Sequence, residues 1–223
     1  MSVLEWDKEG ERFYQTGVDH GVLYMKDNNG DYTDAHVWNG LTTVTATPSG
    51  AEASDTWADN IKYLSLLSAE DFTLSVECVT YPDAFEECLG HKVVNGVVIP
   101  QQVRPRFSFA YRTLIGNDID GTDLGYKLHL VYNCRSGVSE EAAATVNDSP
   151  EPLSMSFEFS TTPVILTSKD ANNKVYKPTA HIEIDSRFAN AAKLKDLEDA
   201  LYGTANSDPY LPTIDDVIDM LAP

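Results

Sequence analysis

The sequence is short of positive charge. Its 223 residues include 16 Lys and Arg against 35 Asp and Glu, which gives a formal net charge of −19. A surface with this balance repels a phosphate backbone, so the composition argues against sequence-reading DNA binding. The chain also lacks a run of eighteen apolar residues, and its first residues, MSVLEWDKEGERF, lack the basic and apolar stretches of a signal peptide. We therefore expect no membrane span and no export.

Reactive residues are also few. The three cysteines, Cys78, Cys88 and Cys134, lack the spacing of a metal site, which favours reduced thiols in a cytosolic setting. The five histidines fall in separate segments, and the chain has no G-x-S-x-G motif and no glycine-rich phosphate loop. His129 falls on the polar face of its predicted strand, where we expect a surface residue. The sequence thus predicts no catalytic site, no metal and no cofactor.

Alternating polar and apolar residues extend over most of the chain and predict a mainly β fold. Asn29-Gly30 and Asn95-Gly96 lie between β-branched residues, a pattern typical of hairpins. A longer hairpin is predicted between residues 106–112 and 126–132. Residues 62–67 are expected to pair with 72–79 across a turn near Ala69. With 42% hydrophobic residues the chain has enough apolar side chains for a core.

Helix is predicted in three short stretches, at residues 82–90, 190–203 and 212–221, from their capping residues and apolar spacing. The last two are expected to be peripheral. We predict a β-sandwich or barrel-like domain over residues 1–202 with a short flanking helix, followed by a linker and small helical extension over residues 203–223. Within the domain, residues 47–60 are expected to form a long loop.

The segment LIGNDIDGTDLGY, residues 114–126, has two interpretations. Asp118, Asp120 and Asp123 are hard oxygen ligands of the kind that calcium needs. Their spacing does not fit an EF-hand loop, because Gly121 comes too early and no Glu follows at the bidentate position. A solvated hairpin loop is the favoured interpretation, since clusters of Gly, Asn and Asp between periodic segments form turns.

Two other classes of function stay open on the residues alone. Acidic residues on strands could form the carboxylate pair of a glycoside hydrolase, although any acidic β protein offers as much. Trp38 and Trp57 could stack on sugars in a carbohydrate-binding or adhesive β module. Core or interface packing is the more common role of a tryptophan, and we favour it here.

Three blocks of sequence carry a family resemblance. They are VWNGLTTVTATPSGAEASDTWADNIKYLSLLSAEDFTLSVECVTYPDAFEECLG from Val37, FAYRTLIGNDIDGTDLGYKLHLVYNC from Phe109, and VNDSPEPLSMSFEFSTTPV ending at Val164. In order and spacing the chain resembles the major tail proteins, or tail tube proteins, of long-tailed (siphovirus-like) bacteriophages of Gram-positive hosts. The resemblance extends more loosely to LPTIDDVIDML near the C-terminus, whereas residues 134–139 depart from it.

This resemblance implies a structural virion protein without catalytic activity. It implies hexameric rings that stack into a hollow tail tube, through which double-stranded DNA passes without specific binding during genome ejection. The implied partners are other copies of the chain, the tape measure protein, the tail terminator and the distal tail or baseplate proteins. The implied location is the virion tail, and the host cytoplasm during assembly.

Candidate residues for these roles follow from charge and strand pattern. Polar side chains without positive charge suit a lumen that DNA traverses, because every Lys or Arg contact with phosphate adds affinity. The lumen candidates are Thr73, Ser75, Glu77, Ser156, Glu158 and Ser160. The subunit-interface candidates are Arg104, Arg106, Arg112, Lys127, Asp118, Asp120 and Asp123. The expected inter-ring loop contains Pro48, Gly50, Glu52 and Trp57.

Replacing Asp118, Asp120 and Asp123 together by Asn tests the two interpretations of the 114–126 segment. Asn keeps the turn chemistry but removes the charge, so we expect normal monomer folding and weaker, salt-sensitive assembly. A chelator is expected to leave the melting temperature and assembly of the wild type unchanged. Normal assembly of the triple variant, together with a lower wild-type melting temperature in chelator, would contradict both expectations.

Overall fold

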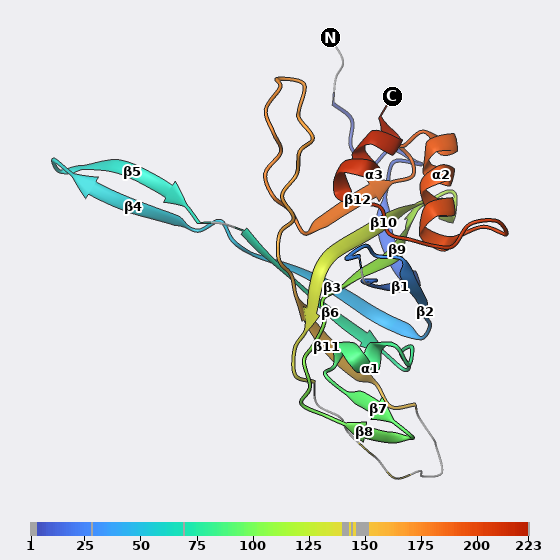
Figure 1. Cartoon of the computed structure of the whole chain (residues 1–223). Coiled ribbons are helices and arrows are strands. Elements are labelled where there is room, and N and C mark those ends of the chain that lie inside the picture. Colours follow the sequence, from blue (N-terminus) through green and yellow to red (C-terminus); the bar gives the residue numbers. More distant parts are fainter. Residues whose placement is uncertain are drawn as a thin grey trace.

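The computed structural model describes residues 4–27, 29–68, 70–139, 143, 145 and 152–222 (Figure 1). The predicted mainly β fold is confirmed. Most strands belong to one antiparallel sheet with the order β2-β1-β9-β10-β11-β6-β3, in which β12 also pairs with β10. The strands are β1 (Tyr14–Met25), β2 (Asp34–Trp38), β3 (Leu41–Gly50), β6 (Glu70–Cys78), β9 (Phe107–Asn117), β10 (Gly121–Ser136), β11 (Met155–Ser160) and β12 (His181–Asp185).

Strand β10 joins two halves of this sheet. Its residues 127–131 pair with β12, and its last residues, Arg135 and Ser136, pair with β11. The first half therefore contains β2, β1, β9, β10 and β12, and the second contains β11, β6 and β3. The two halves share one strand but face each other across a core, which gives the sandwich-like arrangement.

The first core lies between the two halves. Alternate residues of β9 and β10 meet alternate residues of β6 and β11, as the period of a strand requires. Trp38 is central, with its ring centroid 4.5 Å from that of Phe85 and 5.4 Å from that of Phe109. The indole donates a hydrogen bond to the carbonyl of Thr80. The core also contains Leu23, Leu74, Val76, Cys78, Cys88, Phe107, Val131, Cys134, Phe157 and Phe159.

The second core lies between the first half of the sheet and two helices, α2 (Ala191–Tyr202) and α3 (Ile214–Leu221), which lie together on one side of that half (Figure 1). The capping box predicted at Thr213 and Asp216 is present. The expectation that these helices are peripheral is wrong, because Leu197, Leu201 and Ile214 are almost fully buried against the sheet. The predicted linker is also packed, since Leu211 is buried and its amide bonds the carbonyl of Tyr32.

Three predicted hairpins are confirmed. They are β1–β2, β9–β10 and the pair β7 (Lys92–Val94) and β8 (Val97–Ile99). Asn95 and Gly96 both have positive φ, as a two-residue turn between strands requires. The predicted short helix is α1 (Phe85–Cys88), and the three cysteines are buried and unpaired. Part of the quoted block VNDSPEPLSMSFEFSTTPV, residues 146–151, lies outside the described residues.

Residues 47–60 are not a loop. Strand β3 continues to Gly50, and residues 53–67 form the hairpin β4 (Ala53–Ala58) and β5 (Ile61–Leu67), which closes through Asp59 and Asn60 in the left-handed region. The predicted pairing of residues 62–67 with 72–79 is also wrong, because β5 pairs with β4 while β6 pairs with β3. Local patterning missed this pairing, because residues 53–58, ASDTWA, lack the apolar alternation that predicts a strand.

One carboxylate fastens α3 to the segment before β12. Asp215 accepts hydrogen bonds from the backbone amides and the hydroxyls of both Thr167 and Ser168, at 2.6–3.2 Å. Because these hydrogen bonds favour the charged form, the pKa of Asp215 lies below its usual range. The contact therefore stabilises the fold at neutral pH.

We expect Asp215→Asn to lower stability by about 1 kcal/mol at pH 7, a charged hydrogen-bond contribution discounted for solvent exposure. At this chain length that is a fall of about 2–4 °C in melting temperature. Because the pKa of Asp215 is lower in the folded state than in the unfolded state, this carboxylate stabilises the fold fully at pH values above its unfolded pKa of about 3.9. That stabilisation is lost as the pH falls towards the folded-state pKa. The difference in melting temperature between the wild type and Asp215→Asn should therefore shrink below about pH 4. Asp219→Asn, in the last turn of the same helix, serves as the control and should not lower the melting temperature.

Candidate functional site

The outer face of the second half of the sheet brings all six lumen candidates together. Strands β6 and β11 pair Thr73 with Ser160, Ser75 with Glu158, and Glu77 with Ser156. Strand β3 continues this face, because its register places Thr47, Thr45 and Thr43 opposite the same three β6 residues. We call these nine residues the polar face: Thr43, Thr45, Thr47, Thr73, Ser75, Glu77, Ser156, Glu158 and Ser160.

The polar face points outwards because the residues that alternate with it along the same strands are apolar. Leu74, Val76 and Phe159 alternate with the polar residues and are buried in the first core, which turns the hydroxyls and carboxylates outwards. None of the strands β3, β6 and β11 contains Lys or Arg. Arg135 of β10 lies opposite Ser160, where the face ends. The centre of the polar face therefore has two carboxylates and no cation.

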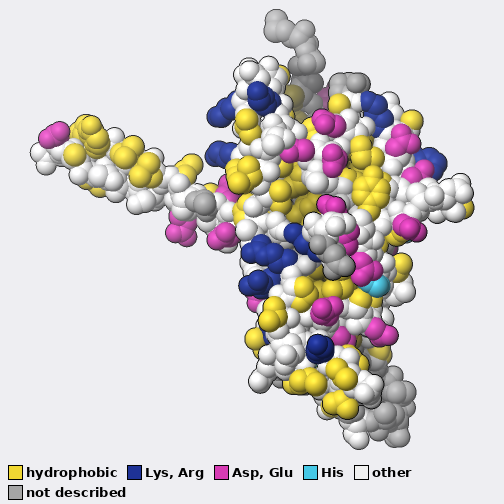
Figure 2. Space-filling view, in the orientation of Figure 1, with side chains coloured by type: hydrophobic (Ala, Val, Ile, Leu, Met, Phe, Trp, Pro, Cys, Tyr) yellow, Lys and Arg dark blue, Asp and Glu magenta, His cyan; other side chains and the backbone are white. Residues whose placement is uncertain are grey.

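A second feature is the hairpin β4–β5, which we call the arm. It projects away from the rest of the protein, and hydrophobic side chains cover much of its surface (Figures 1 and 2). The strands of the arm pair only with each other in the described sheets. Its exposed apolar side chains are Trp57, Ile61, Tyr63, Leu64, Leu66 and Leu67. Trp57 is 67% exposed, so the expectation of a core role does not hold for it, and its interface role stays a prediction.

The apolar residues of the arm lie on both of its faces. Tyr63 and Leu64 are neighbours in one strand, so their side chains point to opposite sides. An isolated two-stranded hairpin is marginally stable in water. The polar contacts of the arm are an ion pair of 2.7 Å between Lys62 and Asp55 and a hydrogen bond from Ser65 to Asp55. The arm is thus a surface whose burial by another molecule is favourable.

The expected inter-ring loop residues lie on the arm or at its base. Pro48 and Gly50 belong to β3 and lie opposite Phe72 and Glu70. The carbonyl of Glu52 accepts a hydrogen bond from the amide of Ser68, which closes the base of the arm. Of the four residues, Pro48 and Gly50 thus lie in a paired strand of the body, Glu52 lies at the base of the arm, and Trp57 lies in the arm.

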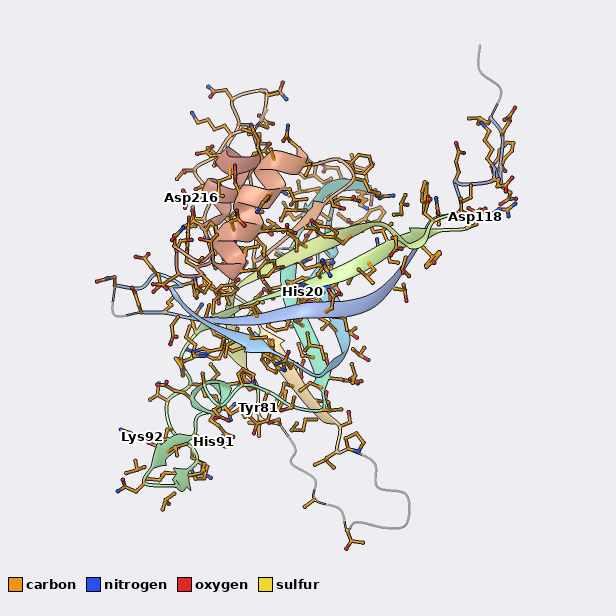
Figure 3. The ribbon with its side chains drawn as sticks, turned by 90° about the vertical axis from the view of Figure 1, so that its right-hand side faces the viewer. His20, Tyr81, His91, Lys92, Asp118 and Asp216 are labelled. Carbon is orange, nitrogen blue, oxygen red and sulfur yellow. The ribbon has the colours of Figure 1, made fainter. Side chains whose placement is uncertain are left out.

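A second exposed hairpin lies at the bottom of the molecule as drawn in Figure 1. The hairpin β7–β8 leaves the body beside α1, and none of its residues is buried (Figure 1). Val93, Val94, Val97, Val98 and Ile99 are between 43% and 61% exposed. Near it, His91 bonds the carboxylate of Glu86 at 2.5 Å, and Tyr81 bonds the other oxygen (Figure 3).

Three interface candidates already have partners in their own chain. Arg104 donates to the carbonyls of Leu89 and Ser136, and Lys127 pairs with Glu183 at 3.1 Å. Arg112 makes two hydrogen bonds of 2.8 Å with Asp19, and these bonds lower the pKa of that carboxyl. These three cations therefore support the protomer itself. That they also contact another subunit stays a prediction, as it does for half-buried Arg106.

The 114–126 segment closes the β9–β10 hairpin, in agreement with the favoured interpretation as a hairpin loop. Asp118, at the tip in Figure 3, accepts a hydrogen bond from the amide of Gly10 and lies 3.7 Å from the guanidinium of Arg12. Asp120 accepts a hydrogen bond from Asn117, and Asp118, Asp120 and Asp123 are all exposed. Asp118 thus holds the N-terminal segment against the hairpin, a role that the sequence did not reveal. Whether these acids also meet another subunit stays a prediction.

The largest departure from the sequence analysis is a cluster of His129, His181 and Glu183. His129 is buried, not a surface residue, and its ring lies parallel to that of Tyr111 with the centroids 4.5 Å apart. The three residues are the only group in the described part of the chain with three potential metal ligands within 4.8 Å of one another. Sequence spacing could not reveal the cluster, because it depends on the pairing of β10 with β12.

No family model matches the chain, and no curated protein matches it significantly. Trp38 is only 2% exposed in the first core, so it is not available to stack on a sugar. No described helix has the length and apolar content that crossing a bilayer requires. The surfaces of the protomer are therefore the basis for assigning its function.

Proposed function

We propose that this protein is a structural subunit that assembles with copies of itself into stacked rings, forming the hollow tail tube of a long-tailed bacteriophage. The arm is the observation that carries this proposal. A two-stranded extension with six large exposed apolar side chains suits burial against another molecule far better than exposure to water. Another copy of the chain is the partner that the resemblance to tail tube proteins supplies.

The hairpin β7–β8 supports the same assembly. It offers a second exposed apolar surface, on a different part of the molecule from the arm (Figure 1). Two separate contact surfaces allow each subunit to bind neighbours in more than one direction. A heterologous contact of this kind closes into a ring or continues along an axis, and a stacked tube requires both.

The polar face supplies a lumen for the tube. Its hydroxyls and two carboxylates carry no positive charge that could bind a phosphate backbone. DNA can therefore slide past without the salt-dependent binding that Lys and Arg create. The net charge of −19 on each chain adds repulsion at longer range. In this proposal the genome passes through during ejection, and the tape measure protein, tail terminator and distal tail proteins are further partners.

Removing the apolar side chains of the arm tests the assembly. We expect the triple substitution Trp57→Ser, Tyr63→Ser and Leu66→Ser to leave a folded, soluble protomer, because these side chains are exposed and outside both cores. Tube formation by concentrated purified protein should be abolished in negative-stain electron microscopy. Ile165→Ser is the matched control, since Ile165 is 80% exposed and outside the arm. Tubes of normal length from the triple variant would refute the role of the arm.

Adding positive charge to the polar face tests the lumen. We expect Glu77→Lys with Glu158→Lys to form tubes that bind short duplex DNA in a salt-dependent manner, whereas wild-type tubes do not. Cosedimentation of tubes with labelled DNA at two salt concentrations measures this binding. The control places the same charge change on exposed helix positions, Asp196→Lys with Asp219→Lys. Equal DNA binding by both variants would argue against a lumenal position of the polar face.

A further inference from the structure

Two neighbouring strands bring His129, His181 and Glu183 to one place. In the register of β10 and β12, His129 lies opposite Glu183 and Val131 lies opposite His181. All three side chains therefore leave the same face of the sheet, because His181 and Glu183 are two residues apart. The cluster lies beside a cavity of about 310 Å³.

The distances between the donor atoms suit a metal ion. Nδ1 of His129 and Nε2 of His181 are 3.4 Å apart, and Nδ1 of His129 is 3.8 Å from Oε1 of Glu183. Two nitrogens that bind one zinc ion tetrahedrally, at about 2.0–2.1 Å each, are about 3.3–3.4 Å apart. The two imidazole rings lie parallel within 4°. Because a bound ion lies in the plane of each ring, His181 must turn on binding, and the adjacent cavity gives it room.

Neighbouring groups orient two of the three ligands, His129 and Glu183. Nε2 of His129 lies 3.0 Å from the hydroxyl of Thr113, which leaves Nδ1 facing the cluster. Lys127 bonds Oε2 of Glu183, while Oε1 of the same carboxylate faces His129. Outer partners of this kind fix the orientation of metal ligands and raise affinity.

The protonation states also suit metal binding. Burial lowers the pKa of His129 to about 4, and burial lowers the pKa of His181 as well. Burial raises the pKa of Glu183, but the hydrogen bond from Lys127 opposes this, and the pKa of Glu183 lies below its usual value. Burial therefore favours the uncharged form of both imidazoles, which is the form that binds a metal ion.

The cavity leads from the cluster to the root of the arm. Besides His181 and Glu183 it is lined by Pro48, Glu70, Asp71 and Phe72, and the ring of Phe72 stacks on that of His181. These residues belong to β3 and β6, just before the two strands continue towards the arm. Glu70 and Asp71 thus place two further acidic residues on the cavity beside the cluster.

We infer that His129, His181 and Glu183 bind one divalent transition-metal ion, with zinc as the ion best matched to two imidazoles and a carboxylate. The ion joins the edge strand β12 to β10 at the root of the arm and stabilises the folded protomer by mass action. This inference does not depend on tube assembly, because all three ligands come from one chain.

Zinc titration of the tag-free, full-length protein after chelator treatment and dialysis tests the site. Isothermal titration calorimetry should show one ion bound per chain, and cobalt should give the visible absorption of a four-coordinate site. His181→Ala and Glu183→Gln should each weaken zinc binding by at least about tenfold, since each removes or neutralises a ligand. His91→Ala is the matched control, because His91 pairs with Glu86 outside the cluster, and it should bind zinc as the wild type does.

Thermal melting provides a second readout. Excess zinc should raise the melting temperature of the wild type and of His91→Ala but not that of either cluster variant. The Asp118, Asp120 and Asp123 triple Asn variant should keep the zinc response, which separates this site from the 114–126 loop. If His181→Ala does not fold, the zinc response of Glu183→Gln alone tests the site. Glu183 is at the exposed side of the cluster, so its substitution is expected to leave the fold intact. No zinc binding by the wild type, or wild-type binding by the folded cluster variants, would overturn the inference.

Discussion

The structure depends on the burial of both faces of the β9–β10 pair. One face of these strands contributes Phe107, Phe109 and Val131 to the core between the two halves of the sheet. The other contributes Leu128 and Leu130 to the core under the helices α2 and α3. Because β10 also pairs with β11, the same strand joins the sandwich, supports the helices and sets the register of β12. Because β9 and β10 are covered on both faces, the other strands, the hairpins and the helices form most of the surface of the protein.

This arrangement divides the surface into regions with different chemistry. The first half of the sheet is covered by helices on its outer side, whereas β3, β6 and β11 keep an uncovered polar face. The arm and β7–β8 each carry a group of exposed large apolar side chains, and other exposed apolar side chains, such as Trp6, Val103 and Phe188, lie outside these hairpins. The exposed apolar side chains of the two hairpins thus lie outside the cores, where another molecule can cover them without rearranging the fold.

The shortage of positive charge has a structural counterpart. Arg104, Arg112 and Lys127 are committed to partners within the chain, so they contribute little free positive charge to the surface. With 35 Asp and Glu against 16 Lys and Arg, the field around the chain is negative. Lys127 also holds Glu183 beside the two buried histidines, so one of these internal ion pairs orients the candidate metal ligands.

Alternation and turn residues act over a few neighbouring positions, so the fold class, three hairpins, the capped helices and the outward direction of Thr73, Ser75 and Glu77 could be predicted from the sequence. Contacts between distant segments could not be predicted in this way. The pairing of β5 with β4 made an arm of the expected loop, and packing on the sheet buried the expected peripheral helices. The register of β10 and β12 brought His129, His181 and Glu183 together. Several segments have similar patterns, and which of them pair depends on the burial that each pairing gives across the whole chain. No short window of sequence contains that information.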